Sequence, residues 1–327
     1  MIIHSRFAPS PTGRLHLGHA WSACLAHDFA RGAGGRFSLR IEDIDGTRSR
    51  PAHVDAILRD LEWLGLGWDD EVTFQSQRLD RYQAALDRLR AMGLLYPCFC
   101  TRADIAASLS APHGPEGTLY PGTCRGLPED AARLAAEPHS WRLDMEAALK
   151  LLPELARGGG PSRSDGGGAG ADAPVPGASL HHRPTAGGPP PRDELGEDLT
   201  WHDAFAGTIA ANPRAHGDVV LARKDAPASY HLAVTVDDAA QGITHIIRGK
   251  DLFSATDVHR LLQALLGLPT PEYRHHDLLL GPDGSRLAKR HGAPTLEAMR
   301  LAGEDGRALA DRLRAGSLPV GIAAAQE

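Results

Sequence analysis

Two histidines near the N-terminus are spaced in a way that could bind a phosphate chain. His16 and His19 are three residues apart, so at the start of a helix they would lie on one face. Gly18 has no side chain, which lets a flat ring or a phosphate approach the backbone. Because helix N-termini favour anions, two imidazole donors beside one could bind a nucleotide triphosphate.

The segment before these histidines, Arg6-Phe7-Ala8-Pro9-Ser10-Pro11-Thr12-Gly13, combines a cation with small residues and stiffening prolines. On its own, the stretch from Arg6 to His19 could be a strand, a turn and the start of a helix that happens to carry two histidines. Together with His16-Leu17-Gly18-His19, it resembles the first signature of class I aminoacyl-tRNA synthetases, in the form used by glutamyl-tRNA synthetases. That resemblance implies catalytic roles and ATP contacts for His16, Gly18 and His19. It also implies an amino-acid site at Arg6, Phe7, Ala8, Pro9 and Ser10.

Three carboxylates follow a predicted strand in Leu39-Arg40-Ile41-Glu42-Asp43-Ile44-Asp45. A carboxylate at a strand end could pair with the ammonium of an amino acid, although a solvated acidic turn would look similar. The run resembles the corresponding motif of glutamyl-tRNA synthetases. The resemblance implies that Glu42 binds the amino group of glutamate and that Arg6 suits a carboxylate, which it can bind bidentately.

Two further segments, 229–238 and 241–252, are predicted to be strands joined by a polar turn. A tyrosine and a strand-end arginine in such places more often serve packing. The resemblance implies instead that Tyr230 belongs to the glutamate pocket and that Arg248 binds the side-chain carboxylate. A cation there would reject glutamine, since the amide would leave it buried and unpaired.

A basic segment near the C-terminus, 284–290, resembles the second class I signature, normally written Lys-Met-Ser-Lys-Ser. Arg286 replaces the first lysine and Ala288 replaces the serine, while Lys289 occupies the place of the second lysine. The resemblance implies that Lys289 is catalytic and stabilises charge on the ATP phosphates. Without it, the segment would be a basic surface turn.

Three of the four cysteines, Cys98, Cys100 and Cys124, fall within one short window. This is no disulfide framework and suits a metal site in a reduced compartment. A structural zinc needs four ligands, and the candidates for the fourth are Tyr120, Asp104 and His113. His113 is the generic choice, and three free buried thiols are the alternative to a metal. The segment 120–124 resembles the glutamyl-Q tRNA(Asp) synthetases, which implies Cys98, Cys100, Tyr120 and Cys124 as ligands.

Hydrophobic patterns predict the elements that position these residues. Strand 2–7, helix 15–31 and strand 37–41 form a βαβ unit, whose strand ends would carry the ligand site. Further helices are predicted at 54–64, 78–94, 256–266 and 296–314, and further strands at 219–223, 231–236 and 243–248. Together with the resemblance, this predicts an α/β fold: the Rossmann-like doubly wound parallel sheet of class I synthetases with an inserted zinc-binding subdomain.

The predicted domains follow the same order along the chain. They are the first half of the catalytic domain (1–95), the zinc-binding insertion (96–157), a disordered Gly/Pro-rich insertion (158–193), the second catalytic half with the lysine loop (194–292) and a C-terminal helix and tail (293–327).

Composition limits the function classes. The 327-residue chain has a formal net charge of -6, so it does not suit non-specific nucleic-acid binding. No apolar stretch approaches the ~20 residues that span a bilayer, and no secretory leader is apparent. We therefore expect a cytoplasmic protein without a membrane partner. A monomer is a separate expectation that the composition does not decide.

About one helix follows Lys289, which leaves no room for the anticodon-binding region of a glutamyl-tRNA synthetase. A catalytic domain with the cysteine window resembles the glutamyl-Q tRNA(Asp) synthetases. The resemblance implies tRNA-independent activation of L-glutamate with ATP and Mg²⁺, one Zn²⁺, and transfer of glutamate to queuosine at position 34 in the anticodon of tRNA(Asp). The alternatives are a truncated glutamyl-tRNA synthetase that charges the 3′ end and an inert tRNA- or zinc-binding module.

Overall fold

The structure, a computed structural model, describes residues 2–101, 104, 119–128, 130–156, 199–281, 287, 295–317 and 322–324. The predicted insertion at 158–193 and most of the lysine loop, including Lys289, lie outside the described residues. None of the described helices combines the length and the apolar character needed to cross a lipid bilayer.

The N-terminal third forms the predicted βαβ unit. Strand β1 (His4–Phe7) pairs in parallel with β2 (Arg36–Ile41), and helix α1 (Leu17–Gly32) connects them. Strand β3 (Thr73–Phe74) extends the sheet in parallel beyond β2. On the other side of β1, the backbone carbonyl of His4 accepts a hydrogen bond from the N–H of Thr244, which leads into β9 (His245–Gly249).

A second parallel group follows from β9. Strand β10 (Glu272–His276) pairs in parallel with β9 and with β6 (Thr200–Asp203), and β7 (Gly207–Ala210) closes the edge as a hairpin with β6. The parallel sheet of the prediction is therefore confirmed.

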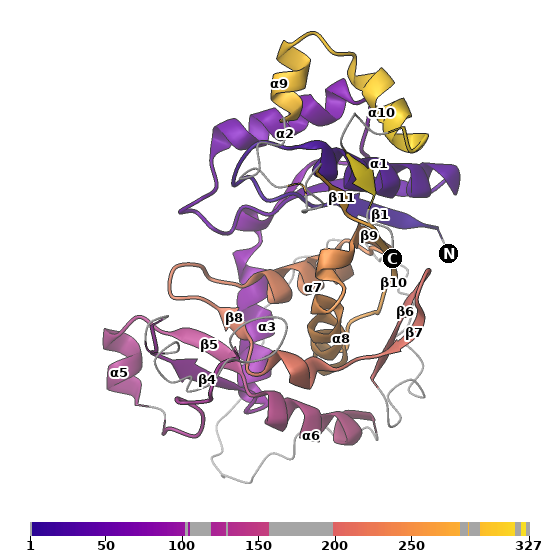
Figure 1. The fold of residues 1–327 in the computed structure, drawn as a ribbon. Coiled ribbons are helices and arrows are strands. Elements are labelled where there is room, and N and C mark those ends of the chain that lie inside the picture. The colour runs from indigo at the N-terminus through magenta and orange to yellow at the C-terminus, as the bar shows by residue number, and fades with distance from the viewer. Residues whose placement is uncertain are drawn as a thin grey trace, which may run out of the picture.

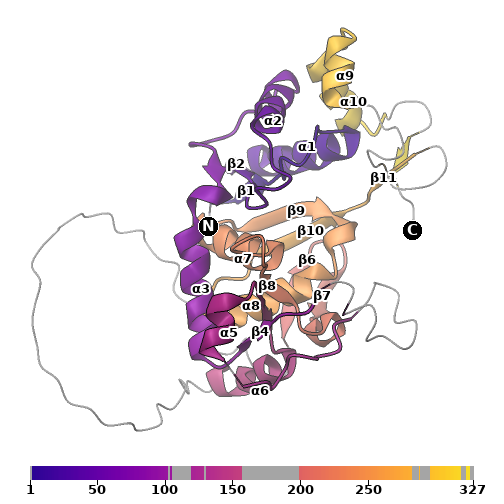
Figure 2. The same cartoon turned by 90° about the vertical axis from the view of Figure 1, so that its left-hand side faces the viewer.

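Helices lie on both faces of these strands (Figures 1 and 2). Helix α1 is on one face, while α7 (Tyr230–Ala240) and α8 (Ala255–Leu266) are on the other. The alternation of β2 explains the difference between the faces, because Leu39 and Ile41 enter the apolar core with α1, whereas Arg40 bonds to a side chain of α7. The sheet is thus apolar on one face and carries buried charges on the other.

The remaining elements surround this sheet. An antiparallel sheet of β4 (Leu95–Cys98), β5 (Ser140–Leu143) and β8 (Val220–Ala222) lies away from α1 (Figure 1). The other helices and strands are α2 (Pro51–Trp63), α3 (Leu79–Ala91), α5 (Ala131–Ala136), α6 (Met145–Ala156), α9 (Leu296–Leu301), α10 (Gly306–Arg314), β11 (Leu279–Leu280) and β12 (Ala323–Ala324). Short 3-10 helices span Gln75–Gln77, Pro213–His216 and Lys250–Leu252.

The structure corrects two predictions. The predicted strand at 231–236 is wrong, because these residues lie inside helix α7. The predicted single helix at 296–314 is two helices, α9 and α10, separated by a turn at Gly303 with a φ of 85°. The carboxylate of Asp305 then caps α10 by accepting hydrogen bonds from the backbone N–H groups of Arg307 and Ala308.

Candidate active site

A cavity of about 380 Å³ opens at the carboxyl ends of β1, β2 and β9, beside the N-terminus of α1. This is where ligands bind in open α/β sheets. The structure brings together in its lining every described residue that the sequence assigned to glutamate or ATP, namely Arg6, Phe7, Ala8, Pro9, Ser10, His16, Gly18, His19, Glu42, Tyr230 and Arg248. Lys289 is the one assigned residue outside the described part of the chain.

The two histidines of the first signature stack against each other at the start of α1. Their ring centroids lie 3.8 Å apart. His16 caps the helix, because its Nδ1 accepts a hydrogen bond from the backbone N–H of Gly18, and Nδ1 of His19 accepts one from the backbone N–H of His16. With both Nδ1 atoms accepting, each ring carries its N–H at Nε2, a donor that suits a phosphate oxygen.

Gly18 is small for a reason that the sequence did not reveal. A Cβ atom at this position would lie 3.0 Å from Cε1 of His16. The glycine therefore makes room for the capping imidazole as well as for any ligand.

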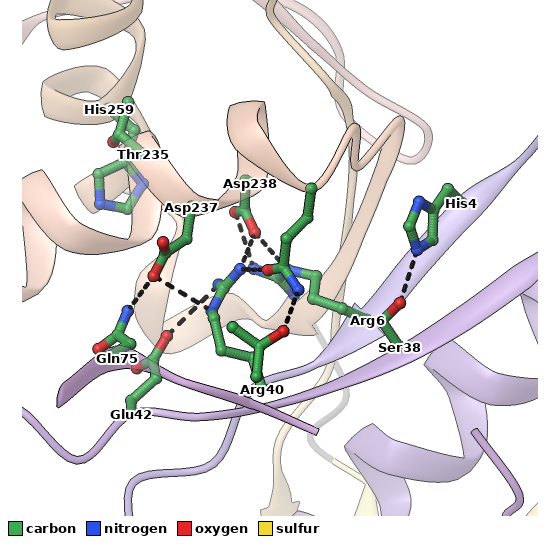
Figure 3. A network of polar contacts seen from close by, with 12 residues as sticks. His4, Arg6, Ser38, Arg40, Glu42, Gln75, Thr235, Asp237, Asp238 and His259 are labelled. Carbon is green, nitrogen blue, oxygen red and sulfur yellow. Dashed lines mark hydrogen bonds and ion pairs between the residues drawn. The ribbon is translucent and has the colours of Figure 1, made fainter. Parts of the chain in front are cut away.

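Buried charges beneath the cavity hold Arg6 in place (Figure 3). The Nε and Nη2 atoms of Arg6 lie 3.0 and 3.3 Å from the two carboxylate oxygens of Asp238 in α7. Arg40 is fully buried and donates to the same carboxylate at 2.8 Å and to the side-chain amide oxygen of Gln241 at 2.7 Å. Burial opposes ionisation of Asp238, but Arg40 and Arg6 outweigh it, so the pKa of this carboxyl is lowered.

The neighbouring carboxylate, Asp237, is satisfied separately. It accepts hydrogen bonds from Gln75 at 2.9 Å, Arg78 at 2.6 Å and the hydroxyl of Tyr82 at 2.7 Å. These bonds tie α7 to α3 and to the segment after β3, and so fix the helix whose first residue, Tyr230, enters the cavity.

Glu42 sits where this network meets the cavity, with 9% of its side chain exposed. Nη2 of Arg40 lies 3.5 Å from one of its oxygens. Burial raises the pKa of Glu42 to about 7, with Asp238 and Asp237 adding to the rise and Arg40 and Arg6 opposing it. A carboxylate so placed would gain from a cation supplied by a ligand.

Arg248 also lines the cavity and is 5% exposed. Its guanidinium donates to neutral acceptors: Nε2 of His275 at 3.0 Å, the hydroxyl of Tyr230 at 3.3 Å, Nδ1 of His259 at 3.4 Å, the carbonyl of Leu252 at 3.1 Å and the hydroxyl of Thr256 at 2.7 Å. Within the described part of the chain, no carboxylate lies within 4.0 Å of it. This buried cation therefore lacks a counter-ion there and is suited to an anionic ligand.

The cysteine window forms a second cluster of donors. The Sγ atoms of Cys98, Cys100 and Cys124 all lie within 4.8 Å of one another. The hydroxyl oxygen of Tyr120 is 3.4 Å from Sγ of Cys98 and 3.6 Å from Sγ of Cys100. Asp104 instead accepts hydrogen bonds from the backbone and hydroxyl of Thr101. His113 lies outside the described residues.

Sequence reasoning missed the residues that support the site from behind. Asp237 and Asp238 stand side by side in the sequence, but a segment predicted as strand and turn made them look solvated. His275 and His259 gave no motif at all. For His275 the signal would have been a polar residue at a buried position of a parallel strand, β10, where unpaired polar groups are costly. His259 lies in helix α8 and gave no comparable signal.

Comparison with known proteins identifies the class. The model of the catalytic domain of class I tRNA synthetases (E and Q) matches residues 2–149 and 192–314. The chain belongs to this family.

Individual relatives agree with this assignment. A protein from Rhodobacter capsulatus named glutamyl-Q tRNA(Asp) synthetase is 46% identical over 91% of this chain and 95% of its own length. A protein of the same name from Symbiobacterium thermophilum is 43% identical over 92% of this chain and 82% of its own. The crystal structure of a glutamate tRNA ligase from Elizabethkingia meningosepticum matches with a TM-score of 0.68 and 25% identity, covering 96% of this chain and 60% of the ligase. The chain thus spans about 60% of the length of that solved ligase.

Proposed function

We propose that this chain activates L-glutamate with ATP and transfers the glutamyl group to queuosine at position 34 in the anticodon of tRNA(Asp). The observation that carries glutamate as the substrate is Arg248, a buried cation on the cavity wall whose described partners are all neutral. The rest of the reaction is supported by the family of this chain, the class I tRNA synthetases (E and Q), and by relatives named glutamyl-Q tRNA(Asp) synthetase.

Two charges of opposite sign would orient glutamate. Arg248 would bind the side-chain carboxylate through Nη1, the edge with the longest hydrogen bonds, 3.3 and 3.4 Å. Glu42 would bind the ammonium, which would stabilise the ionised form of this carboxyl. Glutamine would place a neutral amide against Arg248 and leave the cation unpaired, so this pair of charges selects against it.

The first reaction step forms the adenylate. The α-carboxylate of glutamate attacks the α-phosphorus of ATP, which enters as its Mg²⁺ complex, and pyrophosphate leaves. The Nε2–H groups of His16 and His19 would donate to phosphate oxygens, and Lys289 would stabilise their developing charge.

In the second step a queuosine hydroxyl attacks the activated carbonyl, an ester bond forms, AMP leaves and the hydroxyl proton is released to solvent. None of the described residues stands out as a general base. Positioning of the two reactants and charge stabilisation would supply the acceleration.

The cysteine cluster fits a structural zinc. A tetrahedral ion with Zn–S bonds of about 2.3 Å needs sulfurs roughly 3.8 Å apart. Sγ of Cys100 and Sγ of Cys124 are 3.5 Å apart, and the Tyr120 hydroxyl lies at a similar distance from two of the sulfurs. We infer that Cys98, Cys100, Tyr120 and Cys124 would hold one Zn²⁺, which would fix the end of β4 to the segment 120–124.

Transfer of labelled glutamate to two tRNA pools tests the function. One pool contains queuosine and the other comes from cells that cannot make it. We expect label only in the queuosine pool. Label in both would mean charging of the 3′ end, and label in neither, without exchange of pyrophosphate into ATP, would leave an inert module.

A further inference from the structure

The guanidinium of Arg248 is held by a chain of buried side chains that have no part in the two proposed reaction steps. Its Nε–H donates to Nε2 of His275 at 3.0 Å. An acceptor at Nε2 means that the proton of the imidazole is on Nδ1, which lies 2.8 Å from Oδ2 of Asp203. Both His275 and Asp203 are 1% exposed, so these bonds are shielded from bulk solvent.

Asp203 is itself fixed by the backbone. Its Oδ1 accepts hydrogen bonds from the N–H groups of Phe205 and Ala206 in the β6–β7 turn, and its Oδ2 also accepts one from the N–H of His275. Hydrogen bonds to both oxygens thus hold the carboxylate in this orientation. Because β6, β10 and β9 are adjacent parallel strands, the chain Asp203–His275–Arg248 runs straight across the sheet to the cavity.

We propose that Asp203 and His275 are positioning residues that aim Arg248 at the side-chain carboxylate of the amino-acid substrate, by holding an unprotonated imidazole nitrogen against its Nε–H. This inference rests on the proposed glutamate site. The guanidinium is planar, so fixing Nε through His275 and Nη2 through Thr256 and Leu252 also fixes the direction of Nη1. Nη1 is the edge next to Tyr230, which lines the cavity.

The protonation state of His275 agrees with this role. Burial and the charge of Arg248 lower the pKa of His275 to about 4, although Asp203 opposes the shift. The imidazole is thus neutral at physiological pH. Asp203 then decides which nitrogen carries the proton, as second-shell carboxylates do for other functional histidines.

Two substitutions at His275 distinguish its role as acceptor for Arg248 from its side-chain bond to Asp203. His275→Gln places a side-chain amide oxygen near the position of Nε2, so it keeps an acceptor for Arg248 and loses the side-chain bond to Asp203, while the backbone bond to Asp203 remains. His275→Asn places its amide nitrogen near Nδ1, so it keeps the bond to Asp203 and loses the acceptor. If His275 served only to anchor Asp203, the asparagine variant, which keeps that bond, would be the less damaging of the two.

Exchange of pyrophosphate into ATP measures the outcome. We expect the KM for glutamate to rise about 10- to 100-fold in His275→Asn and in Asp203→Asn, and only a few-fold in His275→Gln. The KM for ATP should stay unchanged in all three. Equal effects of the two His275 substitutions, or a smaller effect of asparagine, would overturn the proposal.

A measurement on the wild-type protein covers the case in which a variant does not fold. The ¹⁵N shifts of His275 in an imidazole-labelled protein report its tautomer directly. Protonation at Nδ1 supports the proposal, and protonation at Nε2 overturns it. Because this readout needs no substrate, it also separates the positioning role from the proposed function, which fails only if wild-type protein does not activate glutamate.

Discussion

Glu42 is the cavity residue whose charge depends most on its surroundings. Burial raises its pKa to about 7, close to working pH, so a fraction of the free protein carries a neutral Glu42. Only the ionised form would pair with the ammonium of glutamate. We therefore expect kcat/KM for glutamate to fall towards a tenfold loss per pH unit below pH 7, since this parameter reports the free enzyme.

The matched variant for this pH limb is Glu42→Gln, which cannot ionise. It should lower kcat/KM for glutamate at pH 8 by about 10- to 100-fold and show no limb near pH 7. The pH profile of kcat/KM for ATP at saturating glutamate separates Glu42 from His16 and His19. An unchanged limb in Glu42→Gln would remove Glu42 as its source.

Asp60 is a second carboxylate whose environment opposes its charge. It is fully buried in α2, and Nε of Arg300 in α9 lies 3.6 Å away, beyond hydrogen-bonding distance. Burial raises the pKa of Asp60 to about 6, with Arg300 opposing the shift. Because an acid whose pKa rises on folding ionises more easily when unfolded, the raised pKa of Asp60 costs nothing well below pH 4. Its destabilising effect grows as the pH rises from about 4 to about 6 and levels off above that.

The substitution Asp60→Asn should therefore stabilise the protein at pH 8, by up to about 3 kcal/mol, and by less than about 1 kcal/mol at pH 4. Denaturant unfolding at the two pH values measures the difference. Asp55→Asn is the matched control, because Asp55 is an exposed aspartate of the same helix and its substitution leaves the buried Asp60 in place. A loss of stability at pH 8 would mean that the ion pair with Arg300 outweighs desolvation.

The residues that line the cavity could be predicted from the sequence, whereas the residues that support them from outside the cavity could not. Arg6, Glu42 and Arg248 lie in short segments that adjoin strand ends, and the resemblance of these segments to family motifs selected them. Asp203 and His275 act through each other across strands 72 residues apart in sequence. Nothing in either local segment encodes that contact.

At the scale of elements, the wrong assignment of α7 has a physical cause. Leu232, Ala233, Val234, Thr235, Asp237 and Asp238 are all buried, so the helix has no exposed stripe. A helix buried all round loses its 3.6-residue period, and its β-branched residues then favour a strand assignment. The break between α9 and α10 was readable, because Gly303 and Asp305 are ordinary stop and start residues.

The thiol cluster gives an element-scale prediction. Metal analysis of protein purified without chelator should find about one zinc per chain, and Cys124→Ser should lose it. Removing the ion should increase hydrogen exchange at β4 and at 119–128, which the donor atoms hold together, and leave β1 and β2 unchanged. Cys24→Ser is the control, since this buried cysteine of α1 belongs to another cluster. Absence of zinc from the wild-type protein would contradict the assigned ligand set.

At the scale of the whole molecule, the net negative charge of the chain opposes the binding of tRNA. The chain has a formal net charge of -6, so its overall field repels a polyanion. Contact with the anticodon must then come from local positive charge. Of 35 basic residues, all but four lysines are arginines, which stay charged at any working pH. Ionic strength, rather than pH, should therefore control this contact.

The two reaction steps should consequently respond differently to salt. Between 50 and 200 mM salt, the KM for tRNA in the transfer step should rise roughly tenfold, as release of counterions from two or three phosphates of a single strand requires. Exchange of pyrophosphate into ATP with glutamate alone should change little, because Arg248 and Glu42 lie in a buried site that salt screens weakly. Equal loss of both activities would mean that salt acts on the catalytic site itself, and a salt-independent transfer would place recognition in base contacts rather than phosphates.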